Sequence, residues 1–488
     1  MSNQINSTHI RRTKIVTTLG PATDRPGELE RLLLAGANVV RLNFSHGTHA
    51  EHKKRIENVR KIAKQHNLII GVLGDLQGPK IRISSFKDGK ILLKEGETFI
   101  LDAEAGPDAG TEKFVGIDYK ELPQDVQAGD MLLLNDGALE LTVSKVEGFK
   151  IYCTVDVGGP LSDHKGINRK GGGLSAKALT EKDKKDLAFV VSMDVDYIAI
   201  SFPRDKRDVL ESKALIEQHN GKAGVIAKIE RVEAVQNIDE IIEASDGIMV
   251  ARGDLAVEIG DAEVPLVQKE IIQKTRQANK PVITATQMME SMIHQMVPTR
   301  AEVSDVANAV FDQTDAVMLS AESAAGDHPH VVVRAMARAC IGAERPSKYT
   351  CCRGVHHVAC CSHIDQAIAM SAIYAANHLN AQGILCLTES GSTTLWMSRI
   401  HTEIPIYGLS RNKTSLGRMS LYRGVYPILF DVTEYSYRAI NKAVVSELVE
   451  RDMLRLNDRV ILTKGDQMGI GGGTSTLKIL AVDELIEK

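Results

Sequence analysis

The chain has 488 residues, of which 43% are hydrophobic and 25% are charged, values that are ordinary for a folded globular protein. The formal net charge is -4 and no basic stripe stands out, which argues against a nucleic-acid partner. No apolar run approaches the roughly 20 residues that span a bilayer, and the polar N-terminus is not typical of a signal peptide. We therefore expect a cytoplasmic protein without a membrane partner, and about three domains at roughly 100–200 residues each.

Eight short apolar runs, each ending in polar or glycine residues, are separated mostly by helical patterns. The runs cover residues 14–20, 38–45, 69–75, 195–202, 224–230, 247–254, 281–287 and 316–322. A strand followed by a helix, repeated eight times, predicts an α/β fold built on a (β/α)8 TIM barrel.

The interval between the third and fourth runs is too long for one helix. Residues 83–173 contain short β-like runs separated by glycine and aspartate turns, which predicts a small inserted β-barrel domain. Placed over the barrel mouth, it could act as a lid. The barrel would then comprise residues 1–82 and 174–344. Residues 345–363 have no periodicity and are predicted to be a linker, and residues 364–488 alternate helix and strand as in an open-sheet α/β domain.

Polar residues gather at the carboxyl ends of the predicted barrel strands, where the active sites of such barrels lie. They are Arg41, Asn43 and Ser45 in the second run, Asp75 in the third, Lys228 and Glu230 in the fifth, Asp254 in the sixth and Thr286 in the seventh. Two carboxylates from neighbouring strands suit Mg²⁺, and a lysine and an arginine beside the metal suit phosphoryl transfer. A purely structural ion pair between Lys228 and Glu230 is the simpler alternative.

Backbone amides at Gly253 and Asp254, where the sixth strand gives way to a turn, could bind a carboxylate. Together with a metal and a cation, they predict a site for a small anionic acid that passes through an enolate.

Seven segments resemble those of the pyruvate kinase family, in the order and spacing of that family. They are VVRLNFSHG (39–47), GDLQGPKIR (74–82), AKIER (227–231), VARGDL (250–255), ATQMMESM (285–292), PTRAEVSDVANAV (298–310) and DAVMLSAESAAG (315–326). The resemblance implies transfer of a phosphoryl group from phosphoenolpyruvate to ADP, which gives pyruvate and ATP. It also implies a homotetramer under allosteric control.

The resemblance assigns a role to each residue of the site. Lys228, Arg41 and Thr286 would be catalytic, and Gly253 and Asp254 would join them in binding the substrate. Asn43, His46, Arg82 and Lys165 would contact the nucleotide, with Lys165 reaching in from the lid. Glu230 and Asp254 would hold Mg²⁺ or Mn²⁺, while Asn43, Ser45, Asp75 and the Leu76 carbonyl would form a K⁺ site.

The loop after the third strand departs from the common family pattern. Residues 76–80 read Leu-Gln-Gly-Pro-Lys, where many members have Thr-Lys-Gly-Pro-Glu. A lysine at position 80 resembles members that dispense with K⁺, because its ammonium supplies a fixed positive charge. We therefore expect little K⁺ dependence, although Lys80 could instead simply face solvent. Ala256 and Asn135 also depart from the family pattern, without removing a catalytic group.

Residues 388–394 (TESGSTT) join a predicted strand to a helix start, as in a phosphate-binding nest. In the family this loop binds a phosphorylated effector, which would involve Thr388, Ser390, Gly391, Ser392 and Thr393. Glu389 disfavours a doubly phosphorylated sugar and favours a sugar monophosphate or AMP. An ordinary helix-capping loop is the alternative. The glycine-rich residues 469–474 are expected to pack beside this loop.

Four of the seven cysteines cluster in the predicted linker. Cys351, Cys352, Cys360 and Cys361 lie near His356, His357 and His363. Adjacent cysteines lack the spacer of a typical zinc site, so we favour a solvent-facing linker over a metal site. The odd total also argues against a disulfide scaffold.

Two other functions remain open at this point. A Mg²⁺-dependent lyase acting through a pyruvate enolate would use a similar barrel and metal pair, but would lack the inserted domain, Arg82 and Lys165. A catalytically inactive regulator on the same fold is disfavoured by the intact Lys228, Glu230, Asp254 and Thr286.

Overall fold

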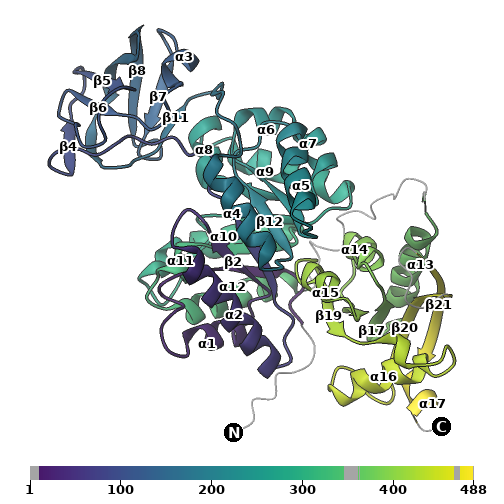
Figure 1. The fold of residues 1–488 in the computed structure, drawn as a ribbon. Coiled ribbons are helices and arrows are strands. Elements are labelled where there is room, and N and C mark those ends of the chain that lie inside the picture. Colours follow the sequence, from purple (N-terminus) through teal and green to yellow (C-terminus); the bar gives the residue numbers. More distant parts are fainter. Residues whose placement is uncertain (1–9, 346–360, 362, 467–472, 487–488) are drawn as a thin grey trace.

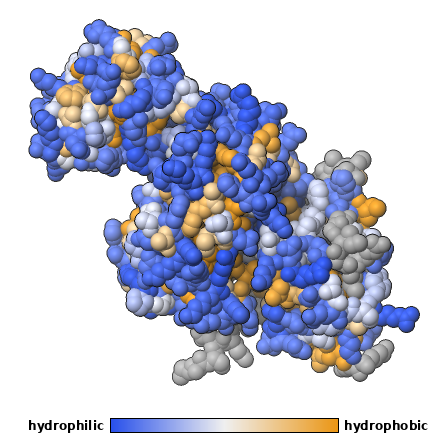
Figure 2. Space-filling view, in the orientation of Figure 1, coloured by the Kyte–Doolittle hydropathy of each residue, from blue (hydrophilic) through white to orange (hydrophobic). Residues whose placement is uncertain are grey.

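The computed structural model describes residues 10–345, 361, 363–466 and 473–486. A β-rich domain stands out from one end of a central barrel, and an α/β domain packs beside the barrel at its other end (Figure 1). Hydrophilic residues cover most of the face shown in Figure 2, and hydrophobic residues reach that surface in patches on all three domains. None of the helices in the described ranges is long and apolar enough to cross a bilayer.

The eight predicted strand runs each contain one strand of a closed, parallel barrel, so the predicted TIM barrel is confirmed. In barrel order the strands are β1 (Lys14–Leu19), β2 (Val39–Asn43), β3 (Gly71–Asp75), β12 (Tyr197–Ile200), β13 (Gly224–Ile229), β14 (Gly247–Ala251), β15 (Val282–Ala285) and β16 (Ala316–Leu319).

Helices surround this barrel. They are α1 (Glu28–Leu34), α2 (His49–Gln65), α4 (Glu181–Ser192), α5 (Lys206–Gln218), α6 (Val232–Gln236), α7 (Ile238–Ala244), α8 (Arg252–Ile259), α9 (Val264–Gln277), η1 (Glu290–Ile293), α10 (Arg300–Phe311), α11 (Ala321–Ala324) and α12 (Pro329–Glu344). Threonine capping boxes begin three of them, α2, α4 and α10. In each box the threonine side chain accepts the amide of the acidic residue three positions on, whose carboxylate accepts the threonine amide in return.

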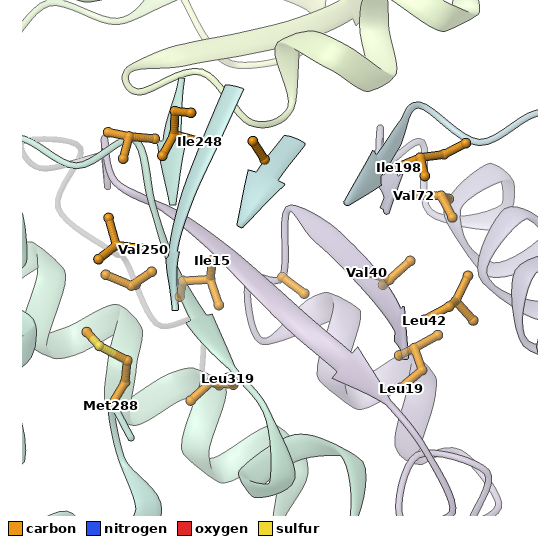
Figure 3. Packing of buried hydrophobic residues seen from close by; sticks show 14 of the residues in the cluster. Ile15, Leu19, Val40, Leu42, Val72, Ile198, Ile248, Val250, Met288 and Leu319 are labelled. Carbon is orange, nitrogen blue, oxygen red and sulfur yellow. The ribbon is translucent and has the colours of Figure 1, made fainter. Parts of the chain in front are cut away.

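Side chains along the barrel strands point alternately outwards and inwards, which gives the barrel an outer and an inner hydrophobic core. Ile15, Val40, Val72 and Ile198 point outwards and pack with the surrounding helices (Figure 3). Their sequence neighbours, among them Val16, Val39, Leu73 and Tyr197, point inwards and fill the barrel. The inward set turns from apolar to polar towards the carboxyl ends of the strands, which locates the functional site.

The inserted segment is β-rich. It contains β4 (Lys90–Leu93), β5 (Thr98–Asp102), β6 (Phe114–Gly116), α3 (Leu122–Asp125), β7 (Met131–Leu134), β8 (Leu139–Glu147), β9 (Lys150–Val157), β10 (Gly159–Ser162) and β11 (Ile167–Arg169). Six strands form one sheet in the order β11-β7-β8-β9-β5-β6, and β10 pairs with β4. The predicted β-barrel is therefore two hydrogen-bonded sheets. Pro160 in β10 has no amide hydrogen, and that strand pairs with β4 rather than closing the larger sheet.

The two connections between barrel and inserted domain are hydrogen-bonded to each other. The Ile83 amide donates to the Lys165 carbonyl at 2.9 Å, and the Ile167 amide donates to the Ile81 carbonyl at 2.9 Å. Between them, Arg82 and Gly166 form an antiparallel bridge. The outgoing and returning chains thus form one short ribbon.

The third domain has a five-stranded sheet in the order β19-β18-β17-β20-β21, with the last strand antiparallel. Its elements are α13 (Ile364–Leu379), β17 (Gly383–Leu387), α14 (Ser392–Arg399), β18 (Ile406–Ser410), α15 (Lys413–Met419), β19 (Val425–Leu429), η2 (Val432–Glu434), α16 (Ile440–Glu450), β20 (Arg459–Gly465), β21 (Thr474–Ala481) and α17 (Val482–Ile486). This confirms the predicted open-sheet α/β domain.

The third domain docks on the amino ends of the barrel strands. Arg399, which ends α14, forms a two-pronged ion pair with the fully buried Asp315, directly before β16. Gly417 of α15 approaches Asp196, directly before β12, so closely that a Cβ at this glycine would overlap the carboxylate. The active-site end and the docking end of the barrel are therefore opposite.

Candidate active site

Every second side chain of a barrel strand points inwards, and at the barrel mouth several of these side chains are polar. Arg41 on β2, Asp75 on β3 and Lys228 on β13 continue the inward rows that begin with Val39, Leu73 and Ile226. Glu230, directly after β13, extends the row of Lys228, and Ser201, directly after β12, extends the inward row of Tyr197 and Ala199. Side chains two residues apart share a face of a strand, which explains why separate strands supply one cluster.

Lys228 is the centre of this cluster. Its Nζ lies 2.9 Å from Glu230 Oε1 and 3.4 Å from Asp75 Oδ1, and it donates to Ser201 Oγ at 2.7 Å. Burial alone would lower the pKa of Lys228, but Asp75 and Glu230 outweigh it and raise the pKa above its ordinary value. The ammonium is therefore held charged in a largely buried site.

Arg41 and Asp75 form the second ion pair of the mouth. Arg41 Nε donates to Asp75 Oδ2 at 2.6 Å, and Arg41 also donates to Thr18 Oγ1 at 3.0 Å. Burial favours a raised pKa for Asp75, but Arg41 and Lys228 together hold the pKa of this carboxyl below its usual value. Arg41 is thus fixed in direction, with the carboxylate as its anchor.

Glu230 is almost completely buried and its two oxygens are engaged differently. Oε1 meets Lys228, and Oε2 accepts the Phe202 amide at 2.9 Å. Burial raises the pKa of Glu230, Lys228 opposes this shift, and the neighbouring Asp254 carboxylate adds to it. Two carboxylates that disfavour each other's charge fit a divalent cation, whose binding would reverse that repulsion.

Asp254 lies in the first turn of α8, not at the end of a strand as the sequence analysis had it. The strand β14 ends at Ala251, and the helix begins directly at Arg252. The Gly253 amide donates to Thr286 Oγ1 at 2.9 Å, so Gly253 and Thr286 are adjacent. The Gly253 amide at this helix start is therefore directed towards Thr286.

Thr286 is held in a strained conformation. Its φ is 67° and that of Gln287 is 53°, in the left-handed region that β-branched residues avoid. Arg252 donates to the Thr286 carbonyl at 2.6 Å, which helps to fix this geometry. Strain of this kind persists where the surroundings enforce it and is concentrated at functional sites.

Lys80 does not simply face solvent. Its Nζ donates to Asp254 Oδ1 at 2.9 Å and lies 3.9 Å from Asp136 Oδ1 in the inserted domain. The lysine that the sequence analysis linked to K⁺ thus contacts the carboxylate that it assigned to Mg²⁺.

The residues assigned to K⁺ lie near one another. Asn43 and Asp75 are register partners on β2 and β3. Ser45 lies beyond the end of β2, in a turn where its amide donates to Asn43 Oδ1 at 3.1 Å, so it does not continue the strand face as predicted. The Leu76 carbonyl accepts Ser201 Oγ at 2.7 Å.

The residues assigned to the nucleotide are divided between barrel and ribbon. His46 follows β2, and its carbonyl accepts His52 Nε2 at 2.9 Å. Arg82 donates to the His164 carbonyl at 2.9 Å, and its partner across the ribbon is Gly166, which follows Lys165 in the chain. The paired connections therefore hold the backbones of Arg82 and Lys165 close together.

The predicted effector loop connects β17 to α14. The Gly391 amide donates to Thr388 Oγ1 at 3.0 Å, and Ser390 Oγ donates to Ser392 Oγ at 3.0 Å. Thr393 Oγ1 is 2.9 Å from Thr474 Oγ1, so the start of β21 lies beside the loop. Most of the glycine-rich stretch 469–474 lies outside the described residues.

The cysteine cluster is only partly visible. Cys351, Cys352, Cys360, His356 and His357 lie outside the described residues, whereas Cys361 is exposed, with its Sγ 3.1 Å from Met370 Sδ. Within the described ranges, no group of three or more histidine, cysteine, aspartate or glutamate side chains is arranged to hold a metal ion.

Sequence reasoning missed three residues that position the site. Ser201 links Lys228 to the Leu76 carbonyl, Thr18 holds Arg41, and Asp136 approaches Lys80. Ser201 could have been found, because it continues the inward alternation of the fourth run. No sequence pattern pointed to Asp136, because its contact with Lys80 depends on where the inserted domain lies.

Comparisons with known proteins agree with this geometry. Two family models match the chain: pyruvate kinase, barrel domain, over residues 10–333, and pyruvate kinase, alpha/beta domain, over residues 366–480. Pyruvate kinase II of Salmonella typhimurium is 53% identical over 481 residues, which cover 98% of this chain and 100% of that protein. The pyruvate kinase of Haemophilus influenzae is 53% identical over 475 residues (96% and 98%), and that of Sporosarcina psychrophila 41% identical over 482 residues (98% and 82%).

A TIM barrel whose mouth combines a charged lysine, an anchored arginine and two carboxylates fits a phosphotransferase. The chain belongs to the pyruvate kinase family. It transfers a phosphoryl group from phosphoenolpyruvate to ADP, as the resemblance predicted, and the alternative of an enolate lyase is not favoured.

Proposed function

We propose that phosphoryl transfer takes place at the barrel mouth, around Lys228, with Mg²⁺ or Mn²⁺ held by Glu230 and Asp254. The observation that carries this proposal is the buried Lys228 ammonium between Glu230 and Asp75, at 2.9 and 3.4 Å. A buried charge is costly unless it is paired, and this one is paired at the edge of an accessible mouth, where a substrate phosphate can approach it.

The chain's own residues divide the work of the reaction. Arg41 orients the phosphoryl group while Asp75 holds the guanidinium in place. The amides of Gly253 and Asp254, with Thr286, hold the substrate carboxylate. As the P–O bond to phosphoenolpyruvate breaks, a β-phosphate oxygen of ADP takes the phosphorus, and Lys228 balances charge on the group in transfer and on the enolate oxygen left behind. The bound divalent ion would add positive charge on the phosphate oxygens.

The inserted domain, for which we propose the boundaries 83 and 173, would close over the nucleotide. Arg82 and Lys165 carry two positive charges on the paired connections, and Asn43 and His46 approach from the barrel side. Asn43, Ser45, Asp75 and the Leu76 carbonyl remain candidates for a K⁺ site, with little need for K⁺ because Lys80 supplies a charge nearby.

Control of activity would come from the third domain, residues 364–488, beyond the linker 345–363. The hydroxyls and amides at Thr388, Ser390, Gly391, Ser392 and Thr393 suit a phosphate group, and Glu389 favours a sugar monophosphate or AMP over a doubly phosphorylated sugar. Glu389 already pairs with Arg411 at 3.4 Å. We also propose a homotetramer and a cytoplasmic location.

A coupled assay tests this function directly. Pyruvate release from phosphoenolpyruvate should require ADP and a divalent ion, and ATP should appear in equal amount. Repeating the assay with and without K⁺, AMP and a sugar monophosphate tests the regulatory part. Pyruvate release without ADP would overturn the kinase function, and absence of turnover under all conditions would support an inactive regulator.

A further inference from the structure

Lys80 lies where the barrel and the inserted domain meet. Its ammonium contacts Asp254 of α8 at 2.9 Å and lies 3.9 Å from Asp136 in the β7–β8 turn. Its stem runs along the paired connections, since a Cβ placed on Gly166 would lie 3.4 Å from Lys80 Cε. The Lys80 side chain therefore lies between the barrel and the inserted domain, within 4 Å of one carboxylate from each.

The β7–β8 turn is shaped to keep Asp136 in this position. Asn135 and Asp136 have φ values of 52° and 56°, two consecutive left-handed residues in a tight turn. A Cβ on the next residue, Gly137, would lie 4.0 Å from Val257 Cγ1, so the turn hangs over α8. The Asp136 side chain is 73% exposed, whereas that of Asp254 is 24% exposed. An ammonium can approach Asp136 with little loss of hydration.

We propose that Lys80 is a resident cation for Asp254 that the divalent ion displaces, and that the displaced ammonium then pairs with Asp136. This proposal depends on the assignment of Asp254 as a metal ligand under the proposed function. An ammonium and a doubly charged ion compete for the same carboxylate oxygens and repel each other. Because Asp136 belongs to the inserted domain, metal occupancy and the position of that domain become coupled through one side chain.

Binding of Mn²⁺ to the free enzyme, without phosphoenolpyruvate or nucleotide, tests the exchange. Free Mn²⁺ would be measured by electron paramagnetic resonance for the wild type, Lys80→Met, Asp136→Asn and the double variant. Lys80→Met should tighten Mn²⁺ binding about fivefold, the upper range for a partly exposed ion pair. Asp136→Asn should weaken it about twofold in the wild type, because Lys80 then has Asp254 as its remaining partner.

The double variant separates this exchange from a general effect of charge. In the Lys80→Met background, Asp136→Asn should leave Mn²⁺ affinity unchanged. An equal weakening in both backgrounds would mean that Asp136 acts only as a nearby negative charge, and would overturn the proposal. So would unchanged affinity in Lys80→Met.

Hydrogen exchange gives a second readout that does not depend on turnover. Mn²⁺ should change protection of the β7–β8 turn amides in the wild type and not in Lys80→Met, and the same response in both proteins would count against the coupling. If the wild type transfers phosphoryl groups but Glu230→Gln and Asp254→Asn bind Mn²⁺ normally, the metal assignment itself fails. That result is distinguishable from a failed exchange.

Discussion

Lys228 shows how a lysine can be buried and still keep its charge. Glu230, Asp75 and Ser201 surround its ammonium, and each makes a further hydrogen bond to a neighbouring segment of the barrel. The positive charge is therefore in place before any substrate arrives. Preorganised charge of this kind is usually the largest single contribution to transition-state stabilisation.

Replacing Lys228 with methionine should lower the turnover number by on the order of 10²–10³ or more, because the charge on the transferring group is no longer balanced. The coupled assay measures the rate, and circular dichroism checks the fold. Lys182→Met is the matched control, since Lys182 also pairs with a carboxylate, Asp186, but on α4. Retention of more than a tenth of the wild-type turnover would rule out Lys228 as the catalytic cation.

The two proposed metal ligands make a separate prediction. Glu230→Gln and Asp254→Asn keep side-chain size but remove charge, so each should raise the Mg²⁺ concentration for half-maximal rate by about tenfold or more. Glu258→Gln is a control, because this carboxylate lies on the same helix as Asp254 and instead accepts the Val232 amide. Unchanged Mg²⁺ activation curves for both test variants would contradict the assignment.

Lys80 leads to a prediction about potassium. K⁺ should stimulate the wild type no more than about twofold, because the Lys80 ammonium supplies charge near the site, whereas Lys80→Glu should show stimulation of roughly tenfold. Initial rates would be measured in K⁺-free buffer with a large organic cation as replacement. Strong K⁺ stimulation of the wild type would refute the idea, whatever the variant does.

At this scale the sequence predicted the strand-borne residues well. Alternation alone placed Lys228 and Glu230 side by side, and they are 2.9 Å apart. Alternation gave the wrong position for residues beyond the end of a strand, because Asp254 belongs to a helix and Ser45 to a turn. The contact of Lys80 with Asp254 joins residues 174 positions apart and depends on loop geometry, which local patterns do not encode.

At the scale of elements, the same side-chain to backbone hydrogen bond occurs four times at the amino end of the barrel. The residue directly before every second strand is an aspartate or asparagine that accepts an amide of the preceding strand. The pairs are Asn38 with Ile15, Asp196 with Val72, Asp246 with Val225, and Asp315 with Val282. These side chains satisfy backbone amides at the amino end of the barrel and fix the start of each strand pair.

Asp196 should make stability depend on pH. Burial against α15 raises its pKa from 3.8 to about 7, despite the Val72 amide. The native state therefore binds an extra proton between these values, so its contribution to stability is full at acid pH and is lost as pH rises through about 7. Asp196→Asn should remove this loss and raise the free energy of unfolding at pH 8, by at most about 4 kcal/mol relative to wild type at about 1.4 kcal/mol per pKa unit.

Urea unfolding between pH 5 and pH 8 checks this prediction. Asp246→Asn is the matched control, because Asp246 caps the equivalent strand but is 41% exposed and contacts Lys213. Its pH profile should follow that of the wild type. A profile of Asp196→Asn that falls as steeply as the wild type between pH 6 and 8 would show that another group titrates.

At the scale of the whole molecule, a buried ion pair holds the third domain on the barrel. Arg399 and Asp315 are 7% and 0% exposed, and Asp315 also accepts the Arg423 amide at 2.9 Å. Arg399→Met should destabilise the docked state by about 3 kcal/mol, because it leaves a buried carboxylate without its cation. The midpoint of the first thermal transition and hydrogen exchange in α14 measure the loss.

The double variant Asp315→Asn, Arg399→Met is the control for that prediction. Removing both charges should recover part of the lost stability, since the cost arises from the unpaired charge and not from the missing contact. If Arg399→Met leaves the first transition and α14 protection unchanged, the pair does not hold the domains together.

The overall plan was largely predictable, and the pairing within the outer domains was not. Eight strand-helix units are the pattern of a closed parallel barrel, so their count and order predicted it. Three of the inserted strands, β6, β10 and β11, have three or four residues each, too few for a periodic signal. Their order depends on contacts between distant segments. The exact domain boundaries and the tetramer remain predictions.

The paired ribbon that joins the barrel to the inserted domain limits how that domain can travel. Two strands tied by hydrogen bonds on both sides of Arg82 and Gly166 bend easily across their flat face but resist sliding past one another. We therefore expect the domain to move mainly by swinging about this ribbon. Because the ribbon holds the backbones of Arg82 and Lys165 together, the two residues that we propose for nucleotide binding would move as one unit during that swing.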